Sequence, residues 1–189
     1  ELVICALLKQ LSEKLDIVRK CAGEILQQLL VSTKPRIPYI PARPALMGAL
    51  ELNDAHQTIG TNWALAHVSF PMIVKLMLLD NDPYHDAILS GLVLSVGGLT
   101  EAVVKSATSA LLTVTKALVK QNHKRGLARL GRTLIALFDK HAGDDRVIVP
   151  LLKTAEVLLE NDVFVPIGDI GTESVLLGVL RAVKAEGRG

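Results

Sequence analysis

Apolar residues recur at helical spacing along most of this chain, with polar residues between them. The stretch 16–31 (DIVRKCAGEILQQLLV) has five apolar residues on one stripe, as a helix packed on one side requires: Val18, Ala22, Ile25, Leu26 and Leu29. The same spacing predicts further helices over 1–11, 44–52, 69–79, 84–96, 101–119, 127–141, 145–160 and 173–184. The pattern therefore predicts an all-α protein.

Two adjacent glycines divide the apolar stretch 87–101 (AILSGLVLSVGGLTE). A glycine inside a helix costs about 1 kcal/mol relative to alanine, so Gly97 and Gly98 are predicted to end one helix. Thr100 then offers an N-cap oxygen to the next helix. Helices joined by so short a turn fold back on each other, which predicts a helical hairpin. Gly91, inside the first helix, indicates that another helix crosses closely there.

The second helix of this hairpin begins with a pattern that occurs elsewhere in the chain. The spacing that starts at Asp16 recurs at Glu101, an offset of 101 − 16 = 85, and at Asp145, an offset of 145 − 101 = 44. The order from Asp16 to Arg19 resembles the inner helix of a HEAT repeat, where the acid caps the helix and can pair with the arginine. The offset of 44 lies within the HEAT-type period of about 40–47 residues, and the offset of 85 is about twice that period. We therefore predict an α-solenoid of HEAT/armadillo-like helical hairpins, with about four to five units.

The chain is expected to be a single helical-repeat segment over 1–189 and a fragment of a longer protein, because Glu1 is not a starting Met and already continues a helical pattern. An irregular insertion is predicted at about 33–69. Its proline-rich part, PRIPYIPARP, favours extended backbone and a rigid linker over a proline-motif ligand. Trp63 lies in the same insertion, either in the core or as an exposed anchor for a partner.

Composition narrows the functional classes. The chain is 50% hydrophobic but 3% aromatic, which suits helices rich in Leu, Val and Ala. Its 21 basic and 19 acidic residues give a net charge of +2, so no global field attracts nucleic acid or a membrane. The stretch 55–74 lacks Asp, Glu, Lys and Arg, but it is too polar and broken to span a bilayer. Cys5 and Cys21 have no CxxC spacing, and they indicate buried free thiols in a reducing compartment.

No constellation of residues requires an enzyme. The five histidines show no HExxH or other metal spacing, and no serine lies in a G-x-S-x-G elbow. The run 97–100 (GGLT) lacks the lysine and the outer glycine of a phosphate-binding loop, which favours a turn. We therefore expect no catalytic residue, no cofactor and no metal.

One cluster of basic residues is a candidate partner-binding site. Arg125, Arg129 and Arg132 are spaced i, i+4, i+7 along one helical face, with Lys120 and Lys124 just before them. The functional interpretation is a site for an acidic partner, whereas a solvated helix face is the other interpretation.

Three stretches together resemble the C-terminal region of the tubulin-specific chaperone D family, also called tubulin-folding cofactor D. They are PRIPYIPAR (35–43), SGLVLSVGGLTE (90–101) and DDRVIVPLLKT (144–154). The resemblance covers about 2–164.

This resemblance implies a non-enzymatic α-solenoid that binds β-tubulin. With cofactors C and E and an ADP-ribosylation-factor-like small GTPase, it would assemble or dismantle the αβ-tubulin heterodimer, and the assembly would stimulate GTP hydrolysis on tubulin. The resemblance also implies a cytoplasmic location, with the cytoskeleton and centrosome as further sites. A general HEAT-repeat scaffold of the transport or trafficking type, with no tubulin role, is the alternative.

Overall fold

The computed structural model describes residues 1–33, 37, 39–52, 61–79, 82–98, 100–167 and 177–181. Over these ranges it contains helices and no strand, which confirms the all-α class and its helical hairpins. The elements are α1 (Leu2–Leu11), α2 (Asp16–Val31), α3 (Arg43–Ala49), α4 (Ala66–Met77), α5 (Asp82–Val96), α6 (Glu101–Lys120), α7 (Lys124–Lys140), α8 (Asp145–Glu160) and the 3-10 helix η1 (Val165–Ile167).

The chain forms two compact units, 1–92 and 93–189, with the boundary inside α5. Unit 1 holds α1 to α4 and most of α5, and unit 2 holds the last turn of α5 and α6 to α8. The prediction of one continuous repeat segment across both units stays a prediction.

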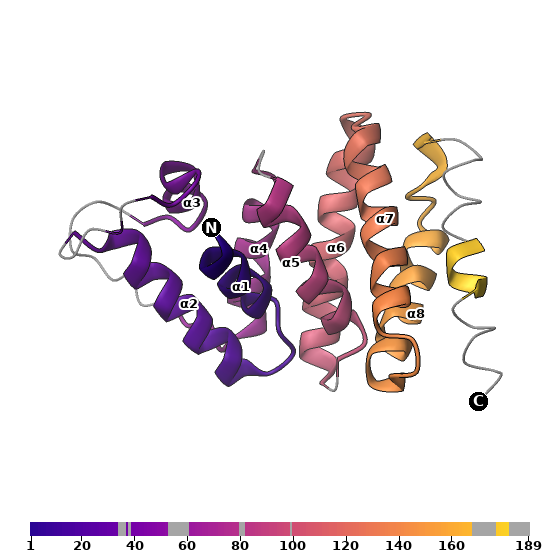
Figure 1. Ribbon diagram of the computed structural model, residues 1–189, viewed down its shortest axis with the longest axis horizontal. Helices are drawn as coiled ribbons and strands as arrows, with labels where there is room; N and C mark the ends of the chain where they lie inside the picture. The colour runs from indigo at the N-terminus through magenta and orange to yellow at the C-terminus, as the bar shows by residue number, and fades with distance from the viewer. Residues whose placement is uncertain are drawn as a thin grey trace. The chain divides into compact units, whose positions relative to one another are not determined.

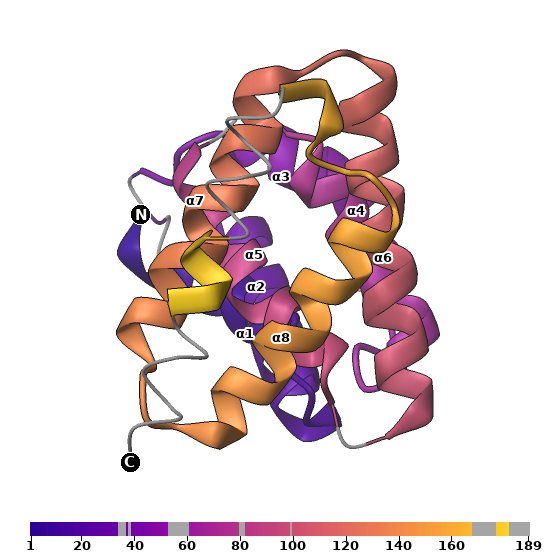
Figure 2. The same cartoon turned by 90° about the vertical axis from the view of Figure 1, so that its right-hand side faces the viewer.

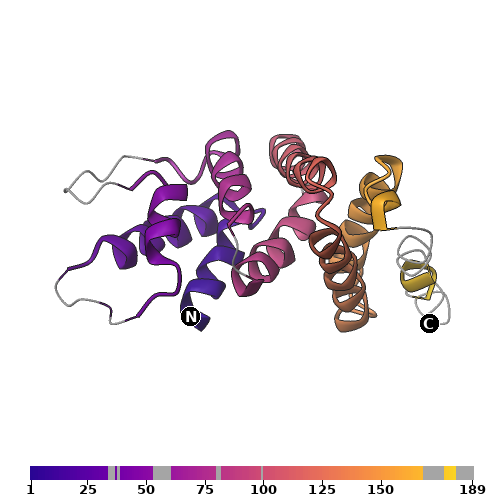
Figure 3. The same cartoon turned by 90° about the horizontal axis from the view of Figure 1, so that it is seen from above.

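In unit 1, α1 packs along α2, and α3 packs on both α2 and α4 (Figure 3). Leu8 and Leu11 of α1 and Leu26 of α2 are fully buried in this core. An added Cβ at Gly91 of α5 would overlap the backbone carbonyl of Lys9 in α1. The predicted close crossing at Gly91 is therefore confirmed, and it is α1 that crosses there.

The buried face of α2 differs from the predicted stripe. Ile25 is 46% exposed, while Arg19 and Gly23 are buried beside Leu26. Gly23 faces the indole of Trp63 so closely that a Cβ would overlap the ring. The face was predicted wrongly because hydrophobicity alone cannot show that an arginine and a glycine lie inward. The cap expected from Asp16 is also absent, since α2 has no side-chain cap hydrogen bond and Asp16 lies in its first turn.

In unit 2, α6 packs against α7 and α8, and α7 packs against α8, so the three helices enclose one core (Figures 1 and 2). The end of α5 joins this core through two contacts with α8. An added Cβ at Gly97 would overlap Pro150, and the hydroxyl of Thr154 donates to the carbonyl of Val93 over 2.8 Å. Gly97 therefore serves packing of the α5–α6 turn on α8.

Thr100 is the N-cap residue of α6, as predicted, but its side chain makes no cap hydrogen bond. The predicted oxygen cap is therefore wrong. The Thr100 carbonyl still accepts from the amide of Val104 over 3.0 Å, which begins the helix through the backbone alone.

By length and composition alone, α6 is the one helix among the described residues that could cross a membrane. In the structure it is a core helix of unit 2, because its apolar face packs on α7 and α8. The buried residues of that face are Val103, Ala107, Ala110, Leu111, Val114, Thr115 and Leu118.

Some of the other predicted helix bounds agree with the structure, and others do not. The helices over 16–31 and 145–160 are confirmed as α2 and α8, whereas α4 begins at Ala66 rather than Ser69. The predicted start is too late because a proline favours the first turn of a helix, whereas Pro71 lies inside α4. Residues 177–181 of the helix predicted over 173–184 are helical, and the rest of it lies outside the described residues.

Candidate functional site

Trp63 belongs to the core of unit 1. Its side chain is 1% exposed, and its Nε1–H donates to Oε1 of Gln27 over 3.1 Å. The interpretation of Trp63 as core is confirmed, and its role as an exposed partner-binding residue is wrong. The physical reason is Gly23, which leaves the space on α2 that the indole occupies.

Arg19, at 1% exposure, is the most unusual buried group of unit 1. Its guanidinium donates to the carbonyls of Glu13 and Lys14 at the α1–α2 turn and to the carbonyl of Ala64. It also lies 5.8 Å from the centroid of the Phe70 ring. Arg19 therefore ties the α1–α2 turn to the segment before α4, and this use of its charge holds the fold together.

Arg43, the first residue of α3, has a similar role in the proline-rich segment. Its guanidinium donates to the carbonyls of Leu29, Leu30 and Ser32 at the end of α2. These carbonyls have no partner within the helix, so the arginine supplies their hydrogen bonds. The hydroxyl of Tyr84 in α5 donates to the carbonyl of Pro41 over 2.7 Å. The described part of this segment is thus hydrogen-bonded to α2 and α5, which agrees with the predicted rigid linker.

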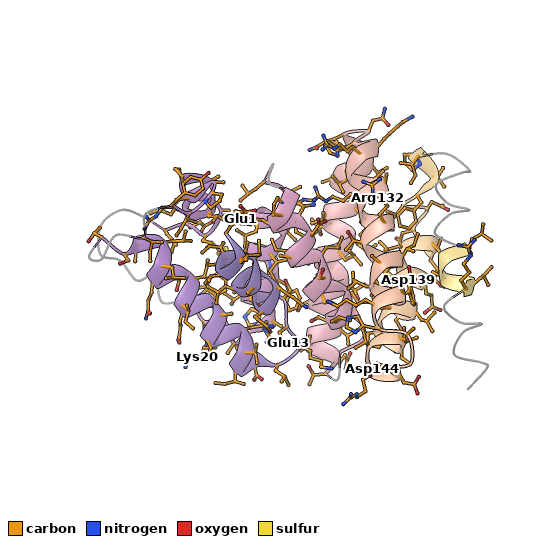
Figure 4. The ribbon with its side chains drawn as sticks, viewed as in Figure 1. Glu1, Glu13, Lys20, Arg132, Asp139 and Asp144 are labelled. Carbon is orange, nitrogen blue, oxygen red and sulfur yellow. The ribbon has the colours of Figure 1, made fainter. Side chains whose placement is uncertain are left out.

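The predicted basic cluster lies where α6 ends and α7 begins, and we name it the basic surface. Its side chains are exposed, except that of Arg129, which is half-buried. The surface faces away from the core, because the residues between its arginines on α7 are the buried ones. Arg132 extends from the upper part of α7 in Figure 4, and Asp139 lies further toward the end of that helix. The basic surface consists of Lys120, Lys124, Arg125, Arg129 and Arg132.

The basic surface sits in a stretch of one charge sign. Residues 102–138 contain seven basic residues and no acidic residue, although the whole chain has a net charge of only +2. The total charge conceals this local excess, and the spacing of the basic residues located only its part over 120–132. The first turn of α7 also carries Lys124 and Arg125 but no acid. Cations are unfavourable at the positive end of a helix dipole, so helix stability does not explain these two residues.

His123 caps the same helix. Its Nδ1 accepts from the amide of Gly126 over 3.0 Å, and a Cβ at Gly126 would overlap the imidazole. That backbone amide is therefore already bonded, and an anion at this end of α7 would be held by the basic side chains.

In the described ranges, no group of three or more His, Cys, Asp and Glu could hold a metal ion. Cys5 and Cys21 are free thiols, Cys5 being half-buried and Cys21 exposed rather than buried as expected.

A family model described as Tubulin folding cofactor D C terminal matches residues 1–189, the whole chain. The chain belongs to this family. The resemblance found in three motifs over about 2–164 is thus confirmed and extends to both ends of the sequence. The match gives the chain a role in tubulin folding and favours that role over a transport or trafficking scaffold. No solved structure matches the chain.

Residues of the three stretches 35–43, 90–101 and 144–154 make contacts that hold helices together. The first supplies Arg43, which caps α2, and Pro41, which accepts from Tyr84. The other two motifs meet in unit 2, where Gly97 packs against Pro150 and Thr154 donates to Val93.

Proposed function

We propose that this chain is a protein-binding scaffold of a tubulin-folding cofactor. In this proposal the cofactor binds β-tubulin and helps to assemble and disassemble the αβ-tubulin heterodimer, together with cofactors C and E and an ADP-ribosylation-factor-like small GTPase. The observation that carries the proposal is the family match over residues 1–189. The chain contributes a docking surface or the support for one.

The physical character of the fold supports a scaffold. In unit 1 the hydrogen bonds of Arg19 and Arg43 fix the helices, and in unit 2 the contact between α5 and α8 does so, which sets the geometry of the outer faces of each unit. Stacked helices of this kind offer many weak contacts over a wide surface, which suits the capture of a large client. The basic surface on α6 and α7 is the described surface whose charge could discriminate between partners.

We further propose that the chain performs no chemistry of its own and uses no cofactor. Stimulation of GTP hydrolysis on tubulin would then belong to the assembly, with the chain contributing to a GTPase-activating complex by positioning its members. Such a role places the protein in the cytoplasm, with access to the cytoskeleton and the centrosome.

The proposal is tested by capture of tubulin, cofactor E and the small GTPase on the full-length protein and on a variant of it that lacks residues 1–189. We expect the deletion to reduce capture of at least one of the three. Equal capture of all three by both proteins would overturn the docking role of this chain.

A further inference from the structure

We propose that the basic surface binds an acidic, extended segment of a protein partner. The inference deepens the proposed function and rests on it only in taking the partner to be a protein. It names the chemistry of the contact, a run of carboxylates, and the side chains that receive it. These are Lys120 and Lys124 at the α6–α7 turn, and Arg125, Arg129 and Arg132 along α7.

The charge of the region is the first support. Residues 102–138 hold seven cations and no acid, whereas the rest of the chain carries 14 basic and 19 acidic residues, so positive charge is concentrated in this stretch. In the first turn of α7, Lys124 and Arg125 add to the positive end of the helix dipole. A bound carboxylate would offset the repulsion between these cations and the dipole, since both the cations and the positive end of the dipole attract it.

The spacing of the arginines is the second support. Arg125 and Arg129 are one helical turn apart, a rise of about 6 Å, and Arg132 continues the same face for about 4.5 Å more. In an extended chain, side chains on one face recur about every 6.6 Å. The spacing of alternate acidic residues in an extended segment therefore matches that of Arg125 and Arg129. The planar guanidinium also allows two hydrogen bonds to each carboxylate.

The surroundings argue against other polyanions. Binding of single-stranded nucleic acid uses exposed aromatic rings for stacking, and the one aromatic residue of 102–138, Phe138, is 1% exposed. Attachment to an anionic membrane usually adds an exposed apolar face to the basic one. Within residues 102–138, Val119 is the one large apolar residue that is exposed. A carboxylate-rich protein segment needs neither feature.

The test measures binding of a fluorescent ten-residue polyglutamate peptide to the full-length protein, with a polyglutamine peptide of the same length as the neutral probe. The test variant is Arg129→Glu with Arg132→Glu. The matched control is Lys105→Glu with Lys153→Glu, two exposed cations of unit 2 outside the basic surface, which changes the net charge equally. We expect the test variant to weaken polyglutamate binding about tenfold or more and the control to keep it. Binding should also weaken as salt is raised.

Arg129 is half-buried, so its reversal could disturb α7. A second variant, Lys124→Glu with Arg132→Glu, changes two exposed residues and should weaken binding in the same way. Polyglutamate binding that is absent, equal in wild type and both variants, or matched by polyglutamine would overturn the proposal. Tighter binding of an RNA oligonucleotide or of phosphatidylserine vesicles than of polyglutamate would also overturn it.

The outcome separates this inference from the proposed function. Loss of tubulin capture on deletion of the chain, with polyglutamate binding unaffected by the variants, would refute the inference alone. Polyglutamate binding that needs the basic surface, with capture of tubulin, cofactor E and the small GTPase all unaffected by the deletion, would refute the proposed function alone.

Discussion

Two arginines of unit 1, Arg19 and Arg43, and two exposed arginines of unit 2, Arg125 and Arg132, occupy different environments. Arg19 donates hydrogen bonds to backbone carbonyls inside unit 1, and Arg43 donates them to the carbonyls at the end of α2. Arg125 and Arg132 lie exposed on α7. In the first pair the charge compensates for carbonyls that have no partner in their own helix or turn. In the second pair the guanidinium groups lie at the exposed surface of α7.

The difference follows from what surrounds each side chain. Burial lowers the pKa of Arg19, and the nearby carboxylates of Asp16 and Glu13 partly oppose this effect. The carbonyls of the α1–α2 turn and of Ala64 make that burial tolerable, because each accepts a hydrogen bond from the cation. An arginine that satisfies several carbonyls is a structural element, whereas an exposed arginine can be used for recognition.

The largest predicted effect is that of Arg19→Ala. The change leaves the carbonyls of Glu13, Lys14 and Ala64 without their donor and opens a cavity, so the free energy of unfolding should fall by about 3 kcal/mol or more. Urea unfolding followed by the fluorescence of Trp63 reports on unit 1 directly, since Trp63 is the only tryptophan. Lys20→Ala, at the exposed neighbouring position, is the control. Equal effects of the two changes would remove the distinction between the arginines.

Arg43→Gln should have the next largest effect. The end of α2 would lose the donor to Leu29, Leu30 and Ser32, which we expect to cost about 2 kcal/mol in the same unfolding measurement. Arg146→Gln, at an exposed arginine that pairs with Asp144, should stay within about 0.5 kcal/mol of the wild type. A neutral Arg43→Gln change would mean that the α2 end needs no side-chain cap.

Tyr84→Phe should cost about 1 kcal/mol through the lost hydrogen bond to Pro41. It should also change the response to pH. Burial raises the pKa of Tyr84 to about 12, with smaller effects of Cys5 and nearby acidic groups, while the unfolded tyrosine has its ordinary pKa of about 10. The tyrosine is therefore favoured neutral in the fold, and wild-type stability should fall as the pH rises from about 10 to 12. The difference in stability between wild type and Tyr84→Phe should shrink over that range. A constant difference would contradict this pKa.

The smallest expected change in stability is that of Lys124→Gln with Arg132→Gln. Both side chains are exposed, so the free energy of unfolding should move by no more than about 0.5 kcal/mol. Circular dichroism during thermal unfolding measures it. A loss comparable to that of Arg19→Ala would show that the basic surface holds unit 2 together.

Helical periodicity was sufficient to predict α2, α6 and α8 almost to the residue, because apolar spacing and turn residues agree there. It could not predict the burial of Arg19, since that depends on carbonyls distant in sequence, above all that of Ala64. The same holds for the contact between Gly97 and Pro150. Of the candidate site, sequence spacing located the basic surface, while Trp63 could be assigned to the core only once Gly23 was found beside it.

Arg19 and Arg43 of unit 1 maintain the fold, whereas the basic surface of unit 2 is proposed to bind a partner. This contrast is tested by the equilibrium affinity of the full-length protein for tubulin, with Lys124→Glu and Arg132→Glu compared with Lys105→Glu and Lys153→Glu. We expect the first pair to weaken binding about tenfold or more at unchanged thermal stability, because both side chains are exposed, and the second pair to leave the affinity intact. Equal affinity of both variants for tubulin would contradict the claim.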